Sequence, residues 1–209
     1  MIFETFPVGM LQCNCTILGD DQTREAIVID PGDDPDVILE VLKKHKLVLK
    51  HIVCTHAHID HVGAIYDLQE RVETPASIHK KDLYLLDHLE AQARWIGMPT
   101  PQRGNVERYL EDGDAIACTG VELGVIHTPG HTPGSLTFQF SKDRTVLFTG
   151  DTLFLRSVGR TDLPGGSHPE LIASIRNKLL TFDDDALVIP GHGQPTTIGA
   201  ERHYNPFLT

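Results

Sequence analysis

The chain has 209 residues, 40% of them hydrophobic, and a formal net charge of −11. This length and hydrophobic content are enough for one domain with a sizeable core. The acidic charge argues against nucleic acid or an anionic membrane surface as the main partner, because both attract basic patches.

The N-terminus and the cysteines favour a cytoplasmic protein. Met1–Thr5 has neither the basic region nor the apolar run of a signal peptide, and the chain lacks the roughly 18 consecutive apolar residues of a transmembrane helix. We therefore expect no secretion and no membrane insertion. Four cysteines are scattered in apolar contexts, as suits a reducing compartment: Cys13, Cys15, Cys54 and Cys118. Cys13 and Cys15 are expected on a buried strand, with a metal role as the alternative.

The first part of the chain alternates between strand and helix patterns. Runs of β-branched residues predict strands, and apolar residues at helical spacing predict helices. Asp34 and Pro35 form a candidate helix start. We expect three strands within residues 2–30, a helix at about 35–46, a strand at 51–55, a helix at about 61–72 and a strand at 74–79.

Residues 80–110 are predicted to leave the sheet. Residues 80–97 have a helical pattern, and prolines and glycines follow it in Gly97–Pro101. We expect this excursion to form a helical lid over a functional site. Its Trp95 is expected to pack within the core or the lid, and a substrate-contacting wall is the alternative.

After residue 113 the strands follow one another closely. Predicted strands lie at about 114–118, 121–127, 134–140, 145–149 and 186–190, with a helix at about 168–181. No linker or low-complexity segment divides the chain, so residues 1–209 are interpreted as one domain. Both halves have strands followed by a helix. This plan predicts an α+β fold, an αββα sandwich of two mixed sheets packed face to face with helices outside.

The main chemical signal is the segment His56-Ala57-His58-Ile59-Asp60-His61, which follows a predicted strand. Imidazole nitrogens and carboxylate oxygens are the usual ligands of zinc and its neighbours among divalent metals. Three further candidates follow strand-like runs, and each has glycine directly before it: His131, Asp151 and His192. Glycine permits the close backbone approach that aims a short side chain at a metal.

Taken in order, these motifs resemble the metallo-β-lactamase superfamily over nearly the whole chain. The resemblance implies two divalent ions, one held by His56, His58 and His131 and the other by Asp60, His61 and His192, with Asp151 bridging them. Zinc is the expected metal, and iron or manganese are the alternatives. Asp30 matches the family's first acidic motif, which supports the ligand loops; a turn before Pro31-Gly32 is the alternative.

Within the superfamily the chain is most similar to glyoxalase II, the hydroxyacylglutathione hydrolases, and to their short single-domain branch. Four segments carry this similarity: Thr55–His61, His127–Gly134, Phe148–Phe154 and Asn205–Phe207. It implies hydrolysis of a glutathione thioester such as S-lactoylglutathione by a metal-bridging hydroxide. Asp60, which could take the hydroxide proton, and Asp151 are the catalytic candidates.

The glutathione contacts are fewer than in larger members of this group. Those members add a C-terminal helical domain, and the chain is too short to contain it. Arg160 lies where they have a lysine that contacts a glutathione carboxylate, so Arg160 is the substrate-binding candidate. Their tyrosine two residues further on is Asp162 here. A salt bridge from Arg160 to Asp162 is the alternative role.

Three other functions remain open from the sequence. Val158–Asp162 also resembles persulfide dioxygenases of the superfamily, in which one iron would be held by His56, His131 and Asp151. Another hydrolase, such as a lactonase or a β-lactamase, is the second alternative, and a non-catalytic metal-binding module is the third. The expected partner is a small molecule. The sequence does not fix the oligomeric state.

Overall fold

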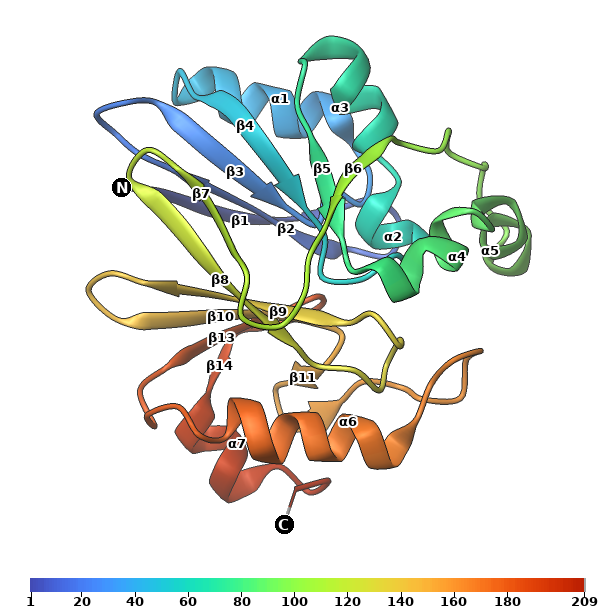
Figure 1. Cartoon of the computed structure of the whole chain (residues 1–209), viewed down its shortest axis with the longest axis vertical. Coiled ribbons are helices and arrows are strands. Elements are labelled where there is room, and N and C mark those ends of the chain that lie inside the picture. Colours follow the sequence, from blue (N-terminus) through green and yellow to red (C-terminus); the bar gives the residue numbers. More distant parts are fainter. Residues whose placement is uncertain (209) are drawn as a thin grey trace.

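The computed structural model describes residues 1–208. Two six-stranded sheets pack face to face, and helices cover their outer faces (Figure 1). The strand orders are β1-β2-β3-β4-β5-β6 and β14-β13-β10-β9-β8-β7. The predicted α+β class and αββα sandwich are confirmed.

The first sheet changes from antiparallel to parallel pairing. Strands β1 to β3 form an antiparallel meander, and β3 to β6 pair in parallel. The parallel strands place their carboxyl ends at one edge, where α/β folds keep their sites. The bounds are β1 Ile2–Val8, β2 Cys13–Gly19, β3 Glu25–Ile29, β4 Val48–Val53, β5 Ala76–Ile78 and β6 Val106–Tyr109, with helices α1 Pro35–Lys44, α2 Ile59–Val62 and α3 Ile65–Arg71.

The second sheet is mainly antiparallel, but β10 and β13 pair in parallel. Its strands are β7 Ala115–Cys118, β8 Val121–His127, β9 Leu136–Ser141, β10 Thr145–Gly150, β13 Leu187–Pro190 and β14 Thr196–Thr197. A two-stranded sheet of β11 Leu153–Phe154 and β12 Ser157–Val158 follows β10, and the outer helices are α6 His168–Ser174, continued by the π-helix η2 Ile175–Leu179, and α7 Ile198–Tyr204.

Three apolar layers hold the sandwich together, and strand alternation explains them. In β3, Ile27 and Ile29 face the layer between the two sheets, whereas Val28 faces the layer beneath α1 and α3. In β10, Leu147 belongs with Leu171 of α6 to the third layer. Because successive side chains of a strand point to opposite faces, fully buried strands need apolar residues at every position.

Several predicted boundaries were wrong. The predicted helix at 61–72 is two helices that meet at Gly63, whose backbone lies so close to Gly32 that an added Cβ would be 2.4 Å from the Gly32 carbonyl oxygen. Asp34 stands at the start of α1, but its carboxylate accepts a hydrogen bond from the Gly9 amide and not from the helix.

The predicted excursion at 80–110 is broken and shorter than expected. It contains a 3-10 turn η1 Lys80–Asp82 and the helices α4 Leu83–Leu86 and α5 Leu89–Ile96, and it returns to the first sheet as β6. Strand β14 and helix α7 were not predicted.

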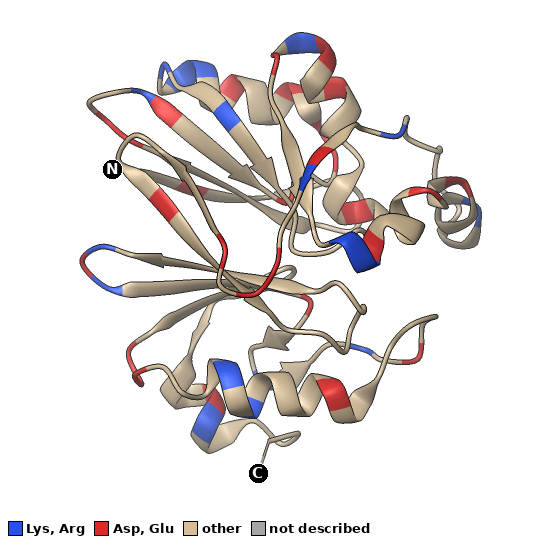
Figure 2. Ribbon diagram, viewed as in Figure 1, with Lys and Arg blue, Asp and Glu red and all other residues tan. Residues whose placement is uncertain are grey.

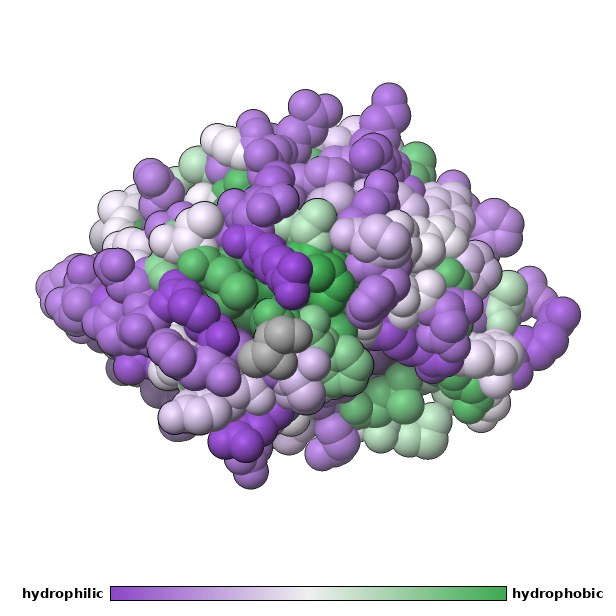
Figure 3. Space-filling view, turned by 90° about the horizontal axis from the view of Figure 1, so that it is seen from below, coloured by the Kyte–Doolittle hydropathy of each residue, from purple (hydrophilic) through white to green (hydrophobic). Residues whose placement is uncertain are grey.

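The surface charge is mixed. Acidic and basic residues are interspersed along helices and turns (Figure 2). The face seen from below is mostly hydrophilic, with apolar side chains gathered near its centre (Figure 3). Within residues 1–208, no helix has the length and apolar character needed to cross a membrane.

Candidate metal centre

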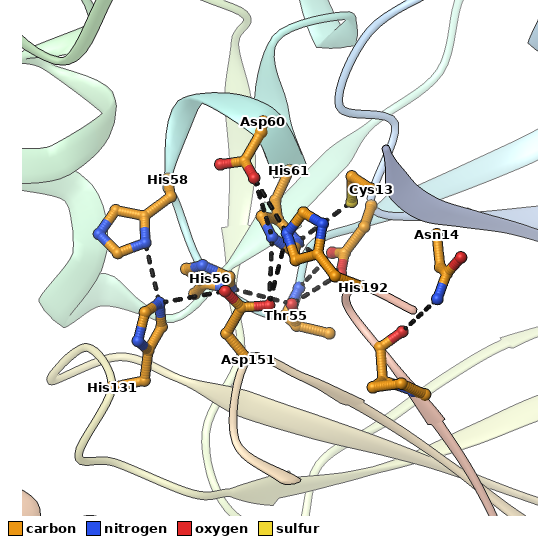
Figure 4. Close-up of polar contacts among 12 residues, drawn as sticks. Cys13, Asn14, Thr55, His56, His58, Asp60, His61, His131, Asp151 and His192 are labelled. Carbon is orange, nitrogen blue, oxygen red and sulfur yellow. Dashed lines mark hydrogen bonds and ion pairs between the residues drawn. The ribbon is translucent and has the colours of Figure 1, made fainter. Parts of the chain in front are cut away.

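The structure brings all seven predicted metal ligands to one place between the sheets (Figure 4). The loop after β4 carries two histidines, and α2 adds an aspartate and a histidine. The loops after β8, β10 and β13 each supply one side chain. In chain order these residues are His56, His58, Asp60, His61, His131, Asp151 and His192.

The seven side chains form overlapping groups whose donor atoms lie within 4.8 Å of one another: His56, His58 and His131; His56, His61 and Asp151; and Asp60, His61 and His192. Asp151 lies between the two outer groups. Its Oδ2 is 3.6 Å from Nε2 of His131, and its Oδ1 is 3.6 Å from Nε2 of His61. This placement suits a carboxylate shared by two cations.

The hydrogen-bond network orients the imidazoles. Nδ1 of His131 lies 2.8 Å from the Arg160 carbonyl oxygen, and Nδ1 of His192 lies 3.0 Å from the Leu11 carbonyl oxygen. A carbonyl only accepts, so each Nδ1 donates its proton to that carbonyl, and each Nε2 is the ring atom left for a metal. Both Nε2 atoms face the centre of the site.

Asp30 and Thr55 orient two of the three remaining histidines, His56 and His61, in the same way. Nδ1 of His61 donates to Asp30 Oδ2 over 3.0 Å. The Thr55 hydroxyl donates to Asp30 Oδ2 over 2.7 Å, so its oxygen accepts from Nδ1 of His56 at 3.1 Å. The carboxylate of Asp30 therefore supports the ligand loop, as its motif implied, and directs a second pair of Nε2 atoms inward.

Three buried atoms in this cluster lack a hydrogen-bond partner among the described residues: Nε2 of His56, Nε2 of His61 and Oδ1 of Asp151. Unpaired buried polar atoms are rare and costly in folded proteins. These three atoms point to the same place as the inward-facing donor atoms of the other ligand side chains. A nitrogen-rich set with two carboxylates fits divalent cations of the zinc, iron and manganese kind.

Burial and neighbouring negative charge shift the pKa values of the histidines in opposite directions. Burial lowers the pKa of His56, and it lowers the pKa of His58 to about 3, so both rings are neutral donors. Burial also opposes protonation of His61, but the neighbouring carboxylates of Asp30 and Asp60 raise its pKa. The surroundings of His61 therefore favour a positive charge, and a bound metal cation would supply that charge in place of a proton on the ring.

A fourth group, Cys13, Asp30 and His61, is a poorer metal site. Burial raises the pKa of the Cys13 thiol to about 12, and a neutral thiol is a weak ligand. Both Asp30 oxygens already accept hydrogen bonds from Thr55. The predicted burial of Cys13 and Cys15 on a strand is confirmed.

Sequence reasoning missed Asp82, a fully buried residue that joins two ligand loops. Its carboxylate accepts hydrogen bonds from the Ala57 amide at 3.2 Å, the Thr132 hydroxyl at 2.7 Å and the Gly134 amide at 2.6 Å. Ala57 lies between two ligand histidines, and Thr132 follows His131. Asp82 comes directly after Lys80-Lys81, so its local sequence is typical of a solvated turn.

A cavity of about 620 Å³ opens on the cluster. His58, Asp60, His131 and Asp151 form part of its lining, together with residues of α4 and α5. The predicted excursion therefore borders the site, while its movement as a lid stays a prediction. A cavity of this size is typical of small-molecule sites.

Arg160 and Trp95 also line this cavity. Nε and Nη2 of Arg160 donate to the Asp162 carboxylate over 2.7 and 2.8 Å, so the predicted alternative ion pair is present. The guanidinium carbon lies 5.7 Å from the centre of the Trp95 ring. Trp95 is 66% exposed, which contradicts packing in the core; it lies on α5 of the excursion and lines the cavity, which favours the substrate-wall alternative.

The comparisons with known proteins agree with this geometry. The sequence profile described as "Metallo-beta-lactamase superfamily" matches residues 8–192. The chain belongs to the metallo-β-lactamase superfamily. Members of this superfamily bind divalent metals, which is consistent with the inward-facing donor atoms. Among curated proteins, hydroxyacylglutathione hydrolase GloC of Haemophilus influenzae is 40% identical, covering 100% of this chain and 98% of that protein.

Solved structures of the superfamily match over the full length. The BLEG-1 B3 metallo-beta-lactamase has a TM-score of 0.92 and 38% identity, with 100% of both chains covered. TTHA1623 in a di-iron-bound form has a TM-score of 0.84 and 37% identity, covering 97% of this chain and 98% of that one. These relatives support the fold and leave the substrate open.

Proposed function

We propose that this protein is a dinuclear metallohydrolase that cleaves glutathione thioesters such as S-lactoylglutathione. The observation that carries the proposal is the convergence of seven donor side chains, four of which line a cavity. Two divalent ions held there would supply a nucleophile from water at neutral pH and polarise the substrate carbonyl. Zinc is our first choice, and iron or manganese are the alternatives.

The ligand assignment follows the three donor groups. His56, His58 and His131 would hold one ion, Asp60, His61 and His192 the other, and Asp151 both. The partners Asp30, Thr55 and the Arg160 carbonyl keep the donor rings in one tautomer and one orientation. Preorganised ligands need no rearrangement when the substrate arrives.

Two side chains are assigned to the chemistry. Asp60 lines the cavity and lies 3.1 Å from Nε2 of His192, where its carboxylate can accept a proton from the nucleophile. Arg160 can offer its remaining guanidinium N–H groups to a substrate carboxylate, because a guanidinium has five and Asp162 engages two. The leaving thiolate is the conjugate base of a thiol of pKa about 8.5, so it needs little acid assistance.

Two points favour a thioester over other acyl compounds. Its thiolate leaves with little help from a general acid, and the relative GloC is named as a hydroxyacylglutathione hydrolase. A β-lactam is the second candidate, because the BLEG-1 structure is titled a B3 metallo-beta-lactamase and is 38% identical.

The test is metal analysis of the purified protein combined with parallel assays. Purified protein is offered S-lactoylglutathione, a lactone and a β-lactam, and oxygen uptake is measured with glutathione persulfide. We expect two equivalents of metal and fastest turnover of the thioester. Fastest turnover of the β-lactam or the lactone, or oxygen uptake with the persulfide, would replace the proposal with that activity.

The matched control uses two aspartates near opposite ends of β10. Asp151 follows the strand and lies in the cluster, whereas Asp143 precedes it and is exposed. Asp151→Ala should lose metal and activity, and Asp143→Ala should keep both. Normal turnover by Asp151→Ala would show that the assigned site is wrong.

A further inference from the structure

Most of the cavity above the donor cluster is apolar. Its lining includes Leu11, Leu85, Ala91, Ile96, Leu163 and Pro164. Among the described residues that line the cavity, Arg160 is the only one, apart from the donor carboxylates, with a carboxylate, ammonium or guanidinium group. The cavity therefore provides a large apolar surface and one cation.

A glutathione thioester has two unequal arms on its reacting carbonyl. The glutathionyl arm carries two carboxylates and an ammonium group, and the acyl arm can be apolar. Charged groups lose more on leaving water than an apolar surface can return, unless they are paired. The charged arm is therefore best placed at Arg160, which is 52% exposed at its side chain and keeps contact with solvent.

We propose that the apolar lining formed by Leu85, Ala91 and Ile96 binds the acyl group, and that the enzyme prefers thioesters with acyl chains longer and more apolar than lactoyl. This inference rests on the proposed function and names the substrate class of the same site. Water adds to the carbonyl carbon, the carbon–sulfur bond breaks, and the products are a carboxylic acid and glutathione thiol. No oxidant or reductant is needed.

The positions of Leu85, Ala91 and Ile96 in the cavity wall support a role in binding the acyl group. Leu85 is 8% exposed and belongs to the apolar layer beneath the helices, so it gives the cavity a firm apolar wall. Ala91 and Ile96 lie on α5, on the same side of the cavity as Trp95. Gln92 fixes this helix to the ligand loop by accepting from the Ile59 amide at 2.9 Å.

The test is kcat/KM for S-acetyl-, S-lactoyl-, S-butanoyl- and S-hexanoylglutathione with the metal-loaded enzyme. Burial of one methylene favours binding enough to raise kcat/KM about four-fold. We expect kcat/KM to rise by about this factor for each added methylene until the cavity is filled. Lactoyl should fall below butanoyl because it is one carbon shorter and carries a hydroxyl group.

Two variants locate the effect. Ile96→Ser should reduce the ratio of the hexanoyl to the acetyl rate, and Ala91→Phe should do the same by filling the space from an exposed helix position. Val37→Ser, on the outer helix α1 and 42% exposed, is the matched control and should keep the ratio of the wild type.

The outcomes separate the two proposals. Hydrolysis of S-lactoylglutathione with a flat or falling chain-length series overturns the acyl-site inference and leaves the proposed function intact. A rising series that persists in both Ile96→Ser and Ala91→Phe also overturns the inference, because the preference then arises elsewhere. Failure to hydrolyse any of the four thioesters overturns both.

Discussion

Asp82→Asn tests whether the metal ligands are positioned by hydrogen bonds between their loops. Asp82 Oδ2 accepts from the Ala57 amide and the Thr132 hydroxyl, and Oδ1 accepts from the Gly134 amide. Asparagine has nearly the same shape but only one acceptor oxygen. If that oxygen replaces Oδ2, the new NH2 group faces the Gly134 amide, and one buried donor loses its partner.

The expected magnitude follows from that loss. An unsatisfied buried donor costs about 1–3 kcal/mol. For a chain of this size each kcal/mol lowers Tm by roughly 2–4 °C, so we expect a decrease of roughly 4–8 °C for a cost near 2 kcal/mol. Replacing a residue that hydrogen-bonds to a metal ligand typically weakens metal affinity by about 10- to 100-fold. Asp82 contacts the loops of His56, His58 and His131, so the affinity for the metal ion assigned to these three histidines should fall most.

The assay is a calorimetric titration of metal-free protein with zinc, with thermal unfolding measured on the same samples. One of the two binding steps should weaken in Asp82→Asn, and the other should stay within about three-fold of the wild type. Asp87→Asn is the matched control, because Asp87 lies in the same segment but pairs with Arg103 at the surface. Two unchanged binding steps in Asp82→Asn would refute the positioning role.

Four further outcomes are expected. Asp151→Ala should lower kcat/KM at least 100-fold, since even outer partners of metal ligands cost that much, and metal analysis should show less bound metal. Chelation should lower Tm, by roughly 8–16 °C for each site whose metal had been at 1,000 times its Kd, as calorimetry would show. Arg160→Ala should raise KM about ten-fold but keep both metals, because His131 bonds the Arg160 backbone carbonyl. Burial, with the nearby His127, lowers the pKa of His79 from 6.5 to about 4. The unfolded chain therefore binds a proton that the folded chain does not, so stability falls as pH drops from about 6.5 to 4, and His79→Gln should flatten that part of the Tm profile.

The strands and helices that were predicted correctly are those with strong apolar patterns. Residues such as Ile27, Val28 and Ile29 are buried on both faces, and their sequence shows it directly. Strand β6 was missed because Val106–Tyr109 is an edge strand with mostly exposed side chains. Helix α7 was missed because it is short and contains Gly199, and buried Glu201 helps to hold it through Thr196 and Asn205.

The ligand residues could be predicted because their spacing is a chemical signature, but their supporting partners could not. Asp82 and Leu11 have no distinctive local sequence, and their roles depend on contacts with residues 50 or more positions away in the chain, at Thr132 and His192. The sequence favours packing for Trp95 because large aromatic residues are usually buried, whereas its exposure and its place in the cavity lining are visible only in three dimensions.

The orientation of the imidazoles links metal binding to the substrate cavity. Arg160 contributes its carbonyl to the ring of His131 and its guanidinium to the cavity lining. Leu11 likewise contributes its carbonyl to His192 and its side chain to the cavity. A shift of the backbone at either position should therefore weaken metal binding and substrate binding together. A change of the side chain alone should affect only substrate binding. The side chains of Leu11 and Arg160 can thus change the lining of the cavity while the donor atoms stay in place.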